Sequence, residues 1–245
     1  MYKRQILLLA FCLSVGNLFA QDANADKLRE EGDAAMTAKN YPEVVAKYSE
    51  YLKLTNYEDE SRVFNCAFAA YNAKKYDDAI KFYDMAIQKG YKTDDAYVGK
   101  AMSLRSQDKA ADFTATVEAG LKANAQNANL EKLLYAYCMK KGQAAQKAGK
   151  TEEAEELFKD VLVVGNAKYK GNALYSLGVM FYNAGAKILA DANPIATSDP
   201  DKYAAEKKKA DAQMAKAKGY LEQAIALNAA DANSKKILDA INAAK

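Results

Sequence analysis

The chain has 245 residues, of which 50% are hydrophobic, and its formal charge is only +3. Outside the first 20 residues, 33 basic residues face 32 acidic ones. This balance leaves no concentrated basic surface, so we expect no nucleic acid as a partner. The absence of histidine from the sequence also excludes histidine-based catalysis and histidine metal sites.

Residues 1–20 have the pattern of an export signal. Two basic residues open the segment, residues 6–15 form an apolar stretch, and the small residue Ala20 closes it. Cleavage after Ala20, or within the small triplet 23–25, fits this pattern. We therefore predict an exported protein, in the periplasm or on the periplasmic face of the outer membrane of a Gram-negative bacterium, with no transmembrane segment in the mature chain.

Two alternatives to a cleaved signal are an uncleaved membrane anchor and a lipid anchor. The apolar stretch is shorter than the roughly 20 residues that an ordinary spanning helix needs, which argues against the first. Residues 9–12 resemble a bacterial lipoprotein box that ends in Cys12. Phe11 stands where that box has a small residue, which argues against the second.

A small residue returns in apolar helical stripes at gaps of 35, 34, 41 and 36 residues. These residues are Gly32, Ala67, Ala101, Gly142 and Gly178. Twelve residues after each of the first four, a second stripe begins at Val44, Ala79, Phe113 and Ala154. A period near 34 residues is typical of stacked helical hairpins, and a content of only 12 Gly and 3 Pro favours helix. We predict an all-α fold.

The recurrence predicts a repeat domain over residues 25–245, made of about five hairpin units and a capping helix. The predicted units are 25–58, 60–93, 94–127, 129–168 and 171–228. The helix 232–244 would cover the apolar end of the array, as such arrays require.

Two cysteines remain after the predicted signal. Cys66 and Cys138 lie on apolar faces of predicted first helices, two repeats apart. We expect this separation to exceed the Cα distance of about 7 Å that a disulfide allows. Both are predicted to be buried, unpaired thiols, even though export places them in a disulfide-permissive compartment.

The fifth unit contains an insertion of 27 residues. Strong helix stops predict that one helix ends near Asp191 and the next begins near Asp201. Residues 187–213 would then form a projecting hairpin arm. Its lysines 207–209 are either a solvated face or a contact for an acidic partner.

The most specific repeat pattern lies in the second unit, in residues 67–71, 76–80 and 83–87. The first-helix part of the pattern returns around Gly178. On these residues the chain, from about 25 to 228, resembles the tetratricopeptide repeat family. The resemblance implies a right-handed superhelical array of helical hairpins that binds other proteins without catalysis.

In that family the first helices of the hairpins line a concave groove, which implies where a ligand would lie. Projected onto this chain, the expected partner-binding residues are Phe64, Phe68, Tyr71, Asn72, Met102, Arg105, Gln143, Tyr175, Tyr182 and Asn183. Aromatic anchors with amides between them suit an extended peptide or a partner's helix. Packing between helices is the alternative role for these aromatic residues.

Some repeats of the family hold the C-terminal carboxylate of chaperones with basic residues and asparagines. Arg29 and Asn65 match two positions of that clamp. Asp33 replaces an asparagine, and Asp95 and Gly99 replace basic residues. Because acids at these positions would repel a carboxylate, we do not expect this ligand.

The sequence shows no catalytic set beside the groove. Two isolated cysteines do not make a zinc site, which needs four ligands. We expect no enzyme activity, cofactor or metal, and predict a non-catalytic protein–protein interaction scaffold of the cell envelope that binds another envelope protein or peptide. The alternatives are a structural, self-assembling envelope component, such as a homo-oligomer, and a small-molecule or glycan-binding module that uses some of the 17 tyrosines.

Overall fold

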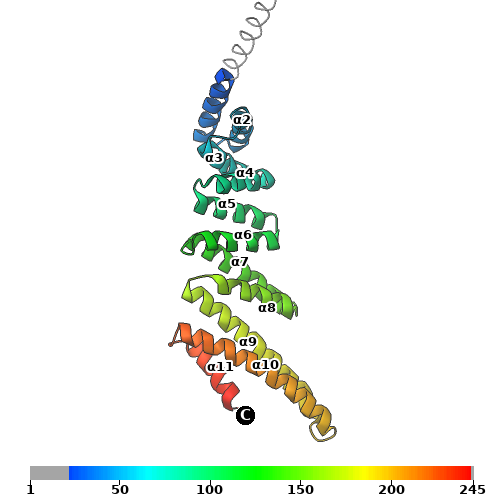
Figure 1. Ribbon diagram of the computed structural model, residues 1–245. Helices are drawn as coiled ribbons and strands as arrows, with labels where there is room; N and C mark the ends of the chain where they lie inside the picture. The colour runs from blue at the N-terminus through cyan, green and yellow to red at the C-terminus, as the bar shows by residue number, and fades with distance from the viewer. Residues whose placement is uncertain (1–21, 244–245) are drawn as a thin grey trace, which may run out of the picture. The chain divides into compact units, whose positions relative to one another are not determined.

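The structure is a computed structural model that describes residues 22–243. Every regular element in this range is a helix, and the range contains no strand. The first helix covers residues 22–37 and is followed by α2 (Tyr41–Leu54), α3 (Glu60–Asn72), α4 (Tyr76–Lys89), α5 (Thr93–Ser106), α6 (Ala110–Ala123), α7 (Ala128–Lys147), α8 (Thr151–Asp160), η1 (Val161–Val163), α9 (Ala167–Ala192), η2 (Asn193–Ile195), α10 (Pro200–Leu227) and α11 (Ala232–Ala243). The predicted all-α fold of paired helices is confirmed (Figure 1).

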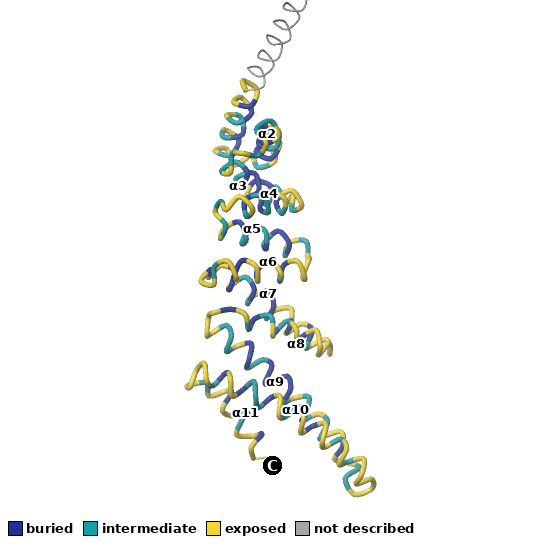
Figure 2. The backbone as a smooth tube through the Cα atoms, in the orientation of Figure 1, coloured by how far each residue is buried: buried dark blue, intermediate teal, exposed yellow. Residues whose placement is uncertain are grey.

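The described residues divide after Gly120 into two compact units, each with a hydrophobic core of its own. Within each unit, buried residues form stripes along the helices, and exposed residues occupy the turns and outer sides (Figure 2). This is the pattern expected of amphipathic helices that bury one face against their neighbours. The predicted export signal and Cys12 lie outside the described residues.

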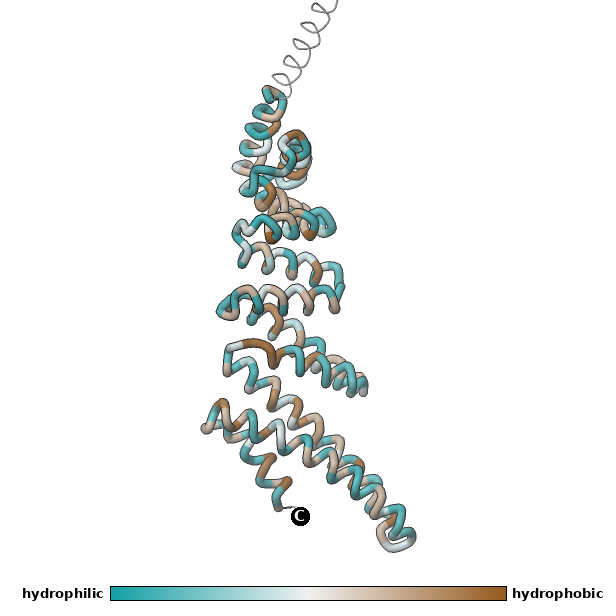
Figure 3. The backbone as a smooth tube through the Cα atoms, in the orientation of Figure 1, coloured by the Kyte–Doolittle hydropathy of each residue, from teal (hydrophilic) through white to brown (hydrophobic). Residues whose placement is uncertain are grey.

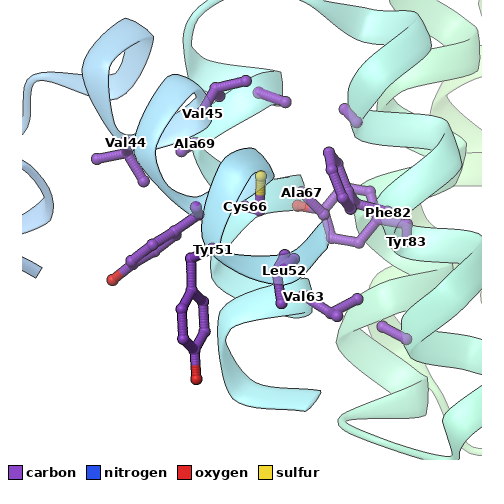
Figure 4. Packing of buried hydrophobic residues seen from close by; sticks show 14 of the residues in the cluster. Val44, Val45, Tyr51, Leu52, Val63, Cys66, Ala67, Ala69, Phe82 and Tyr83 are labelled. Atoms are coloured by element: carbon purple, nitrogen blue, oxygen red, sulfur yellow. The ribbon is translucent and has the colours of Figure 1, made fainter. Parts of the chain in front are cut away.

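In the first unit, small residues let the paired helices approach closely. The Tyr48 ring of α2 lies against Gly32 so closely that a Cβ atom there would overlap it. Ala67 and Ala79 are fully buried at the corresponding places of the α3–α4 hairpin. Figure 4 shows Ala67 among the larger side chains of this core, which α2, α3 and α4 supply.

A left-handed residue recurs in the turns between paired helices. Lys39, Lys74 and Asp108 have φ values of 57°, 59° and 55°, and Gly149 has 75°. The next residue donates its N–H to a carbonyl five positions back each time, as in Lys75 to Ala70 at 2.8 Å. This is the Schellman arrangement that ends a helix. The turns follow one another at gaps of 35, 34 and 41 residues, the same gaps as the first four small residues.

In the second unit, α7 pairs with α8 and α9 with α10, while α11 packs mainly on α10. A Cβ atom at Gly142 would lie 2.6 Å from the Phe158 ring, and one at Gly178 would lie 2.7 Å from Leu221. Close approach at a small residue therefore positions both hairpins. The segment between α8 and α9 is strongly hydrophobic (Figure 3), and within it Val164 is fully buried.

The α9–α10 hairpin extends beyond α11 as a two-helix arm (Figure 1). The two helices have 26 and 28 residues, and Ala210 is fully buried between them. In the lysine run of the arm, Lys207 pairs with Asp211 at 2.9 Å and Lys209 with Glu206 at 2.7 Å. These pairs favour a solvated, largely neutralised face over a contact for an acidic partner.

Both remaining cysteines are buried and carry free thiols, as predicted. Cys66 lies in the core of the first unit, and its Sγ is 3.7 Å from the Ser49 hydroxyl. Cys138 lies on α7 in the second unit and is fully buried.

Candidate interaction surface

Helix α3 presents a row of aromatic side chains. The helix begins where the Asp59 carboxylate accepts the backbone N–H of Arg62 at 3.0 Å, which caps its N-terminus. Phe64, Phe68 and Tyr71 then fall about one turn apart, on the same side of the helix. Phe68 is 42% exposed, whereas Phe64 and Tyr71 are half-buried.

Rings from neighbouring helices and loops extend this row. Tyr41 meets Phe68 edge-on at 5.9 Å between ring centroids, and Tyr76 lies 5.9 Å from Tyr71. Tyr91 lies 6.2 Å from Phe64. Such pairs contribute about 0.5–1.5 kcal/mol each beyond their buried area. We call these six residues the α3 aromatic face: Tyr41, Phe64, Phe68, Tyr71, Tyr76 and Tyr91.

Polar groups border this face. The Asn72 side chain is exposed and donates to the Phe68 carbonyl at 2.8 Å. The Lys92 ammonium lies 5.1 Å from the centre of the Phe64 ring, within the range of a cation–π contact. The face is therefore an apolar surface held in place by its own contacts, with one cation at its edge.

The predicted residues Met102 and Arg105 lie on α5, which packs against α4 and α3. Both are half-buried. Gly99, one of the clamp positions, faces the Tyr83 ring of α4, and a Cβ atom there would overlap that ring. A basic side chain at this position would have to displace Tyr83, which adds a steric argument against the chaperone-type clamp.

Asp33, another of the three positions that depart from the clamp pattern, anchors the helices of the first unit to one another. Its carboxylate accepts from the Arg62 guanidinium at 2.8 and 3.3 Å and from the Tyr48 hydroxyl at 2.6 Å. Burial disfavours the charged carboxylate, but these hydrogen bonds outweigh it and hold the pKa of Asp33 below its usual value. An asparagine here would remove the nearer of the two carboxylates that pair with Arg62, the other being Asp59 at 3.6 Å.

The other four predicted residues lie in the second unit. Gln143 on α7 and Asn183 on α9 are exposed, whereas Tyr175 and Tyr182 are half-buried and pack against the core of that unit. Packing against this core therefore buries part of each ring, which is the alternative role expected for these residues.

The second unit contains a ring stack that is not among the residues predicted from the sequence. The rings of Tyr135 and Tyr169 lie 4.3 Å apart and nearly parallel, at 12°. Asn172 donates from Nδ2 to the Tyr135 hydroxyl at 2.8 Å. The side chains come from α7 and α9, so the stack joins two first helices of successive hairpins.

Tyr41 and Tyr76 are also absent from the residues predicted from the sequence. They stand 35 residues apart, the same gap as Gly32 and Ala67, at the starts of α2 and α4. That repetition was the signal that could have identified them.

Cys66 and Cys138, the two cysteines among the described residues, are not activated as nucleophiles. Burial raises the pKa of Cys66 and of Cys138 to about 12, so both stay protonated near neutral pH. Within residues 22–243, no group of acidic or cysteine side chains has an arrangement that could hold a metal ion. No helix in the same range combines the length and apolar character needed to cross a membrane.

These helical hairpins, with small residues at each crossing and an aromatic first-helix face, define a helical repeat protein. A solved tetratricopeptide repeat protein from Bacteroides fragilis is 44% identical to this chain, with a TM-score of 0.84. The match covers 90% of this chain and 99% of that one. The chain belongs to the tetratricopeptide repeat family, whose members generally mediate protein–protein interactions.

A second relative is the Hsp70-Hsp90 organizing protein 1 of Glycine max. It is 30% identical over 154 residues, which cover 60% of this chain but only 26% of that protein. No protein-family model matches the chain.

Proposed function

We propose that this chain is a non-catalytic scaffold of the bacterial cell envelope that binds a peptide segment or a helix of a partner protein on the α3 aromatic face. Membership of the tetratricopeptide repeat family supports protein binding as the general activity. The name of the Glycine max relative likewise describes a protein that organises two others.

The exposure of Phe68 is the observation that carries the proposal. Large hydrophobic side chains are exposed at only three of the described positions: Phe68, Val163 and Leu227. Phe68 differs from the other two because it lies in a row of aromatic rings with an exposed amide beside it. Aromatic residues in such settings dominate the binding energy of protein interfaces.

Site-specific photo-crosslinking tests the proposal. A photoreactive phenylalanine analogue replaces either Phe68 or Val163, which is 50% exposed in the second unit and serves as the control. We expect a discrete adduct with a partner from position 68 and none from position 163. The same adducts from both positions, or none from position 68, would contradict binding on the α3 aromatic face.

The envelope location rests on the predicted export signal of residues 1–20. Mass spectrometry of the protein purified from its native cells tests it. We expect a mature N-terminus after Ala20 or within residues 23–25. Recovery of the uncleaved chain from the cytoplasm would contradict the location. A lipid on Cys12 would instead show that the scaffold is anchored to a membrane.

A further inference from the structure

The second unit contains a cavity of about 500 Å³ at the corner where α9 begins, α10 ends and α11 begins. Its volume lies in the range of about 300–1,000 Å³ that small-ligand pockets occupy. The cavity shares no residue with the α3 aromatic face. Protein binding on that face therefore does not explain this cavity.

Three amides line the cavity: Asn172, Asn228 and Asn233. The Asn172 amide is oriented by its hydrogen bond to the Tyr135 hydroxyl. The Asn228 Oδ1 accepts the N–H of Ala230 at 3.1 Å, which leaves the NH₂ group of this lining residue available as a donor. Hydrogen bonds within the chain thus orient two of the amides, Asn172 and Asn228, and all three offer donors and acceptors.

Asp231 adds a carboxylate that is held rigidly. Its Oδ1 accepts the backbone N–H groups of Asn233 and Ser234, both at 3.1 Å, and its Oδ2 accepts from the Ser234 hydroxyl at 2.6 Å. A carboxylate has about four lone-pair sites, so one acceptor site remains for a ligand. Lys168 lines the same cavity, and its charge balances that of Asp231.

Apolar surface completes the lining. The half-buried ring of Tyr175 forms part of it, and Leu227 stays 40% exposed at the same place. An aromatic ring and an aliphatic side chain beside fixed amides suit a ligand with an apolar face and a polar rim. A sugar ring has this composition, since its C–H groups form a face and its hydroxyls both donate and accept.

We propose that this cavity binds a neutral saccharide of one or two rings. Side chains already accept the N–H groups of Lys168 and Tyr169 at the start of α9 and those of Asn233 and Ser234 at the start of α11, so these four donors do not serve an anion. Lys168 and Asp231 have opposite formal charges, which leaves the lining without net charge and favours an uncharged ligand. The inference concerns a different unit from the protein-binding face, so either can fail alone.

Titration of the full chain by two-dimensional NMR tests the inference. The probes are glucose, galactose and N-acetylglucosamine with one disaccharide of each, and glucuronic acid as the charged comparison. We expect shift changes confined to residues 168–175 and 224–233, with a dissociation constant in the millimolar range. Absence of such changes with every neutral probe, or tighter binding of glucuronic acid than of glucose, would overturn the proposal.

A matched pair of variants on α11 separates binding from folding. Asn233→Ala removes an amide that lines the cavity, whereas Asn242→Ala removes an exposed amide elsewhere on the same helix. Loss of one hydrogen bond should weaken saccharide binding about three- to tenfold for Asn233→Ala. Both variants should keep the melting temperature of the parent. Equal affinity of the two variants would overturn the assignment.

Discussion

At the scale of single residues, four turns between paired helices depend on a left-handed backbone. Gly149 adopts it without cost, because glycine has no Cβ. Lys39, Lys74 and Asp108 adopt it with a side chain, which costs a non-glycine residue about 1 kcal/mol or more. These three positions therefore store strain that the hairpin architecture imposes.

Replacing Lys74 by glycine should relieve this strain. We expect Lys74→Gly to raise the free energy of unfolding by about 0.5–1 kcal/mol, because Lys74 has a φ of 59° and is exposed. Lys81→Gly is the control, since Lys81 lies within α4 and glycine there should cost about 1 kcal/mol. Urea denaturation measures both, and a loss of stability in both variants would refute the argument.

Gly99 is expected to require glycine for a different reason, the closeness of a ring. A Cβ atom at Gly99 would overlap the Tyr83 ring, which is only 3% exposed and has little room to move. We expect Gly99→Ala to cost about 1–3 kcal/mol. Gly219→Ala should instead stabilise α10 by up to about 1 kcal/mol, because no atom lies within 4 Å of a Cβ there.

A double variant identifies the cause of the Gly99 effect. If the ring is responsible, Gly99→Ala should cost much less when Tyr83 is already leucine, and the two substitutions should be non-additive by about 1 kcal/mol or more. Additive costs would place the origin of the effect elsewhere.

At the scale of the elements, Glu131 holds the start of α9 to α7. Its side chain is only 7% exposed, and its Oε1 accepts the backbone N–H of Gly165 and, at 3.0 Å, that of Asn166. Hydrogen bonds to a charged group contribute about 1.5–3 kcal/mol. Glu131 therefore holds in place the loop of Gly165 and Asn166, which leads into α9 and its residue Tyr169.

We expect Glu131→Ala to lower the free energy of unfolding of the second unit by about 2 kcal/mol. Amide hydrogen exchange should also show faster exchange at Gly165 and Asn166, whose N–H groups lose their acceptor. Glu153→Ala, which removes an exposed acid from the first turn of α8, is the control and should change neither amide. Unchanged exchange in Glu131→Ala would show that the loop is held by other contacts.

The elements themselves could be predicted from the sequence because their causes are local or periodic. The spacing of small residues reflects helix crossings, which need a small residue in every hairpin, as at Gly142 and Gly178. The break in the fifth unit was predicted between Asp191 and Asp201, and the structure ends α9 at Ala192 and begins α10 at Pro200. Asparagine and proline stop helices by local chemistry, which the sequence shows directly.

The contacts of the candidate surfaces could not be predicted in the same way, because they join distant positions. In the sequence Glu131 is an acid in a first helical turn, which the helix dipole alone would explain. Its actual acceptor role depends on N–H groups 34 and 35 residues further along. The stack of Tyr135 on Tyr169 likewise exists only once α7 and α9 are packed.

At the scale of the whole molecule, stability should be constant near neutral pH and fall in alkali. The 245 residues include no histidine, so no imidazole titrates near pH 6.5. Burial raises the pKa of Cys66 and Cys138 to about 12, whereas thiols of an unfolded chain titrate near about 8.5. Above that pH the unfolded state loses its thiol protons first, so the free energy of unfolding decreases.

Each thiol should remove about 1–2 kcal/mol of stability between about pH 8 and pH 10. Urea titrations across this range measure the loss in the parent chain and in Cys66→Ala and Cys138→Ala. Each variant should remove the alkaline loss of its own thiol, because alanine does not ionise and both sites are fully buried. Since Cys66 lies in the first unit and Cys138 in the second, separate unfolding transitions would show which unit each thiol affects. An alkaline slope that persists in the double variant would assign it to the buried tyrosines Tyr48 and Tyr83, whose pKa values are also raised by burial.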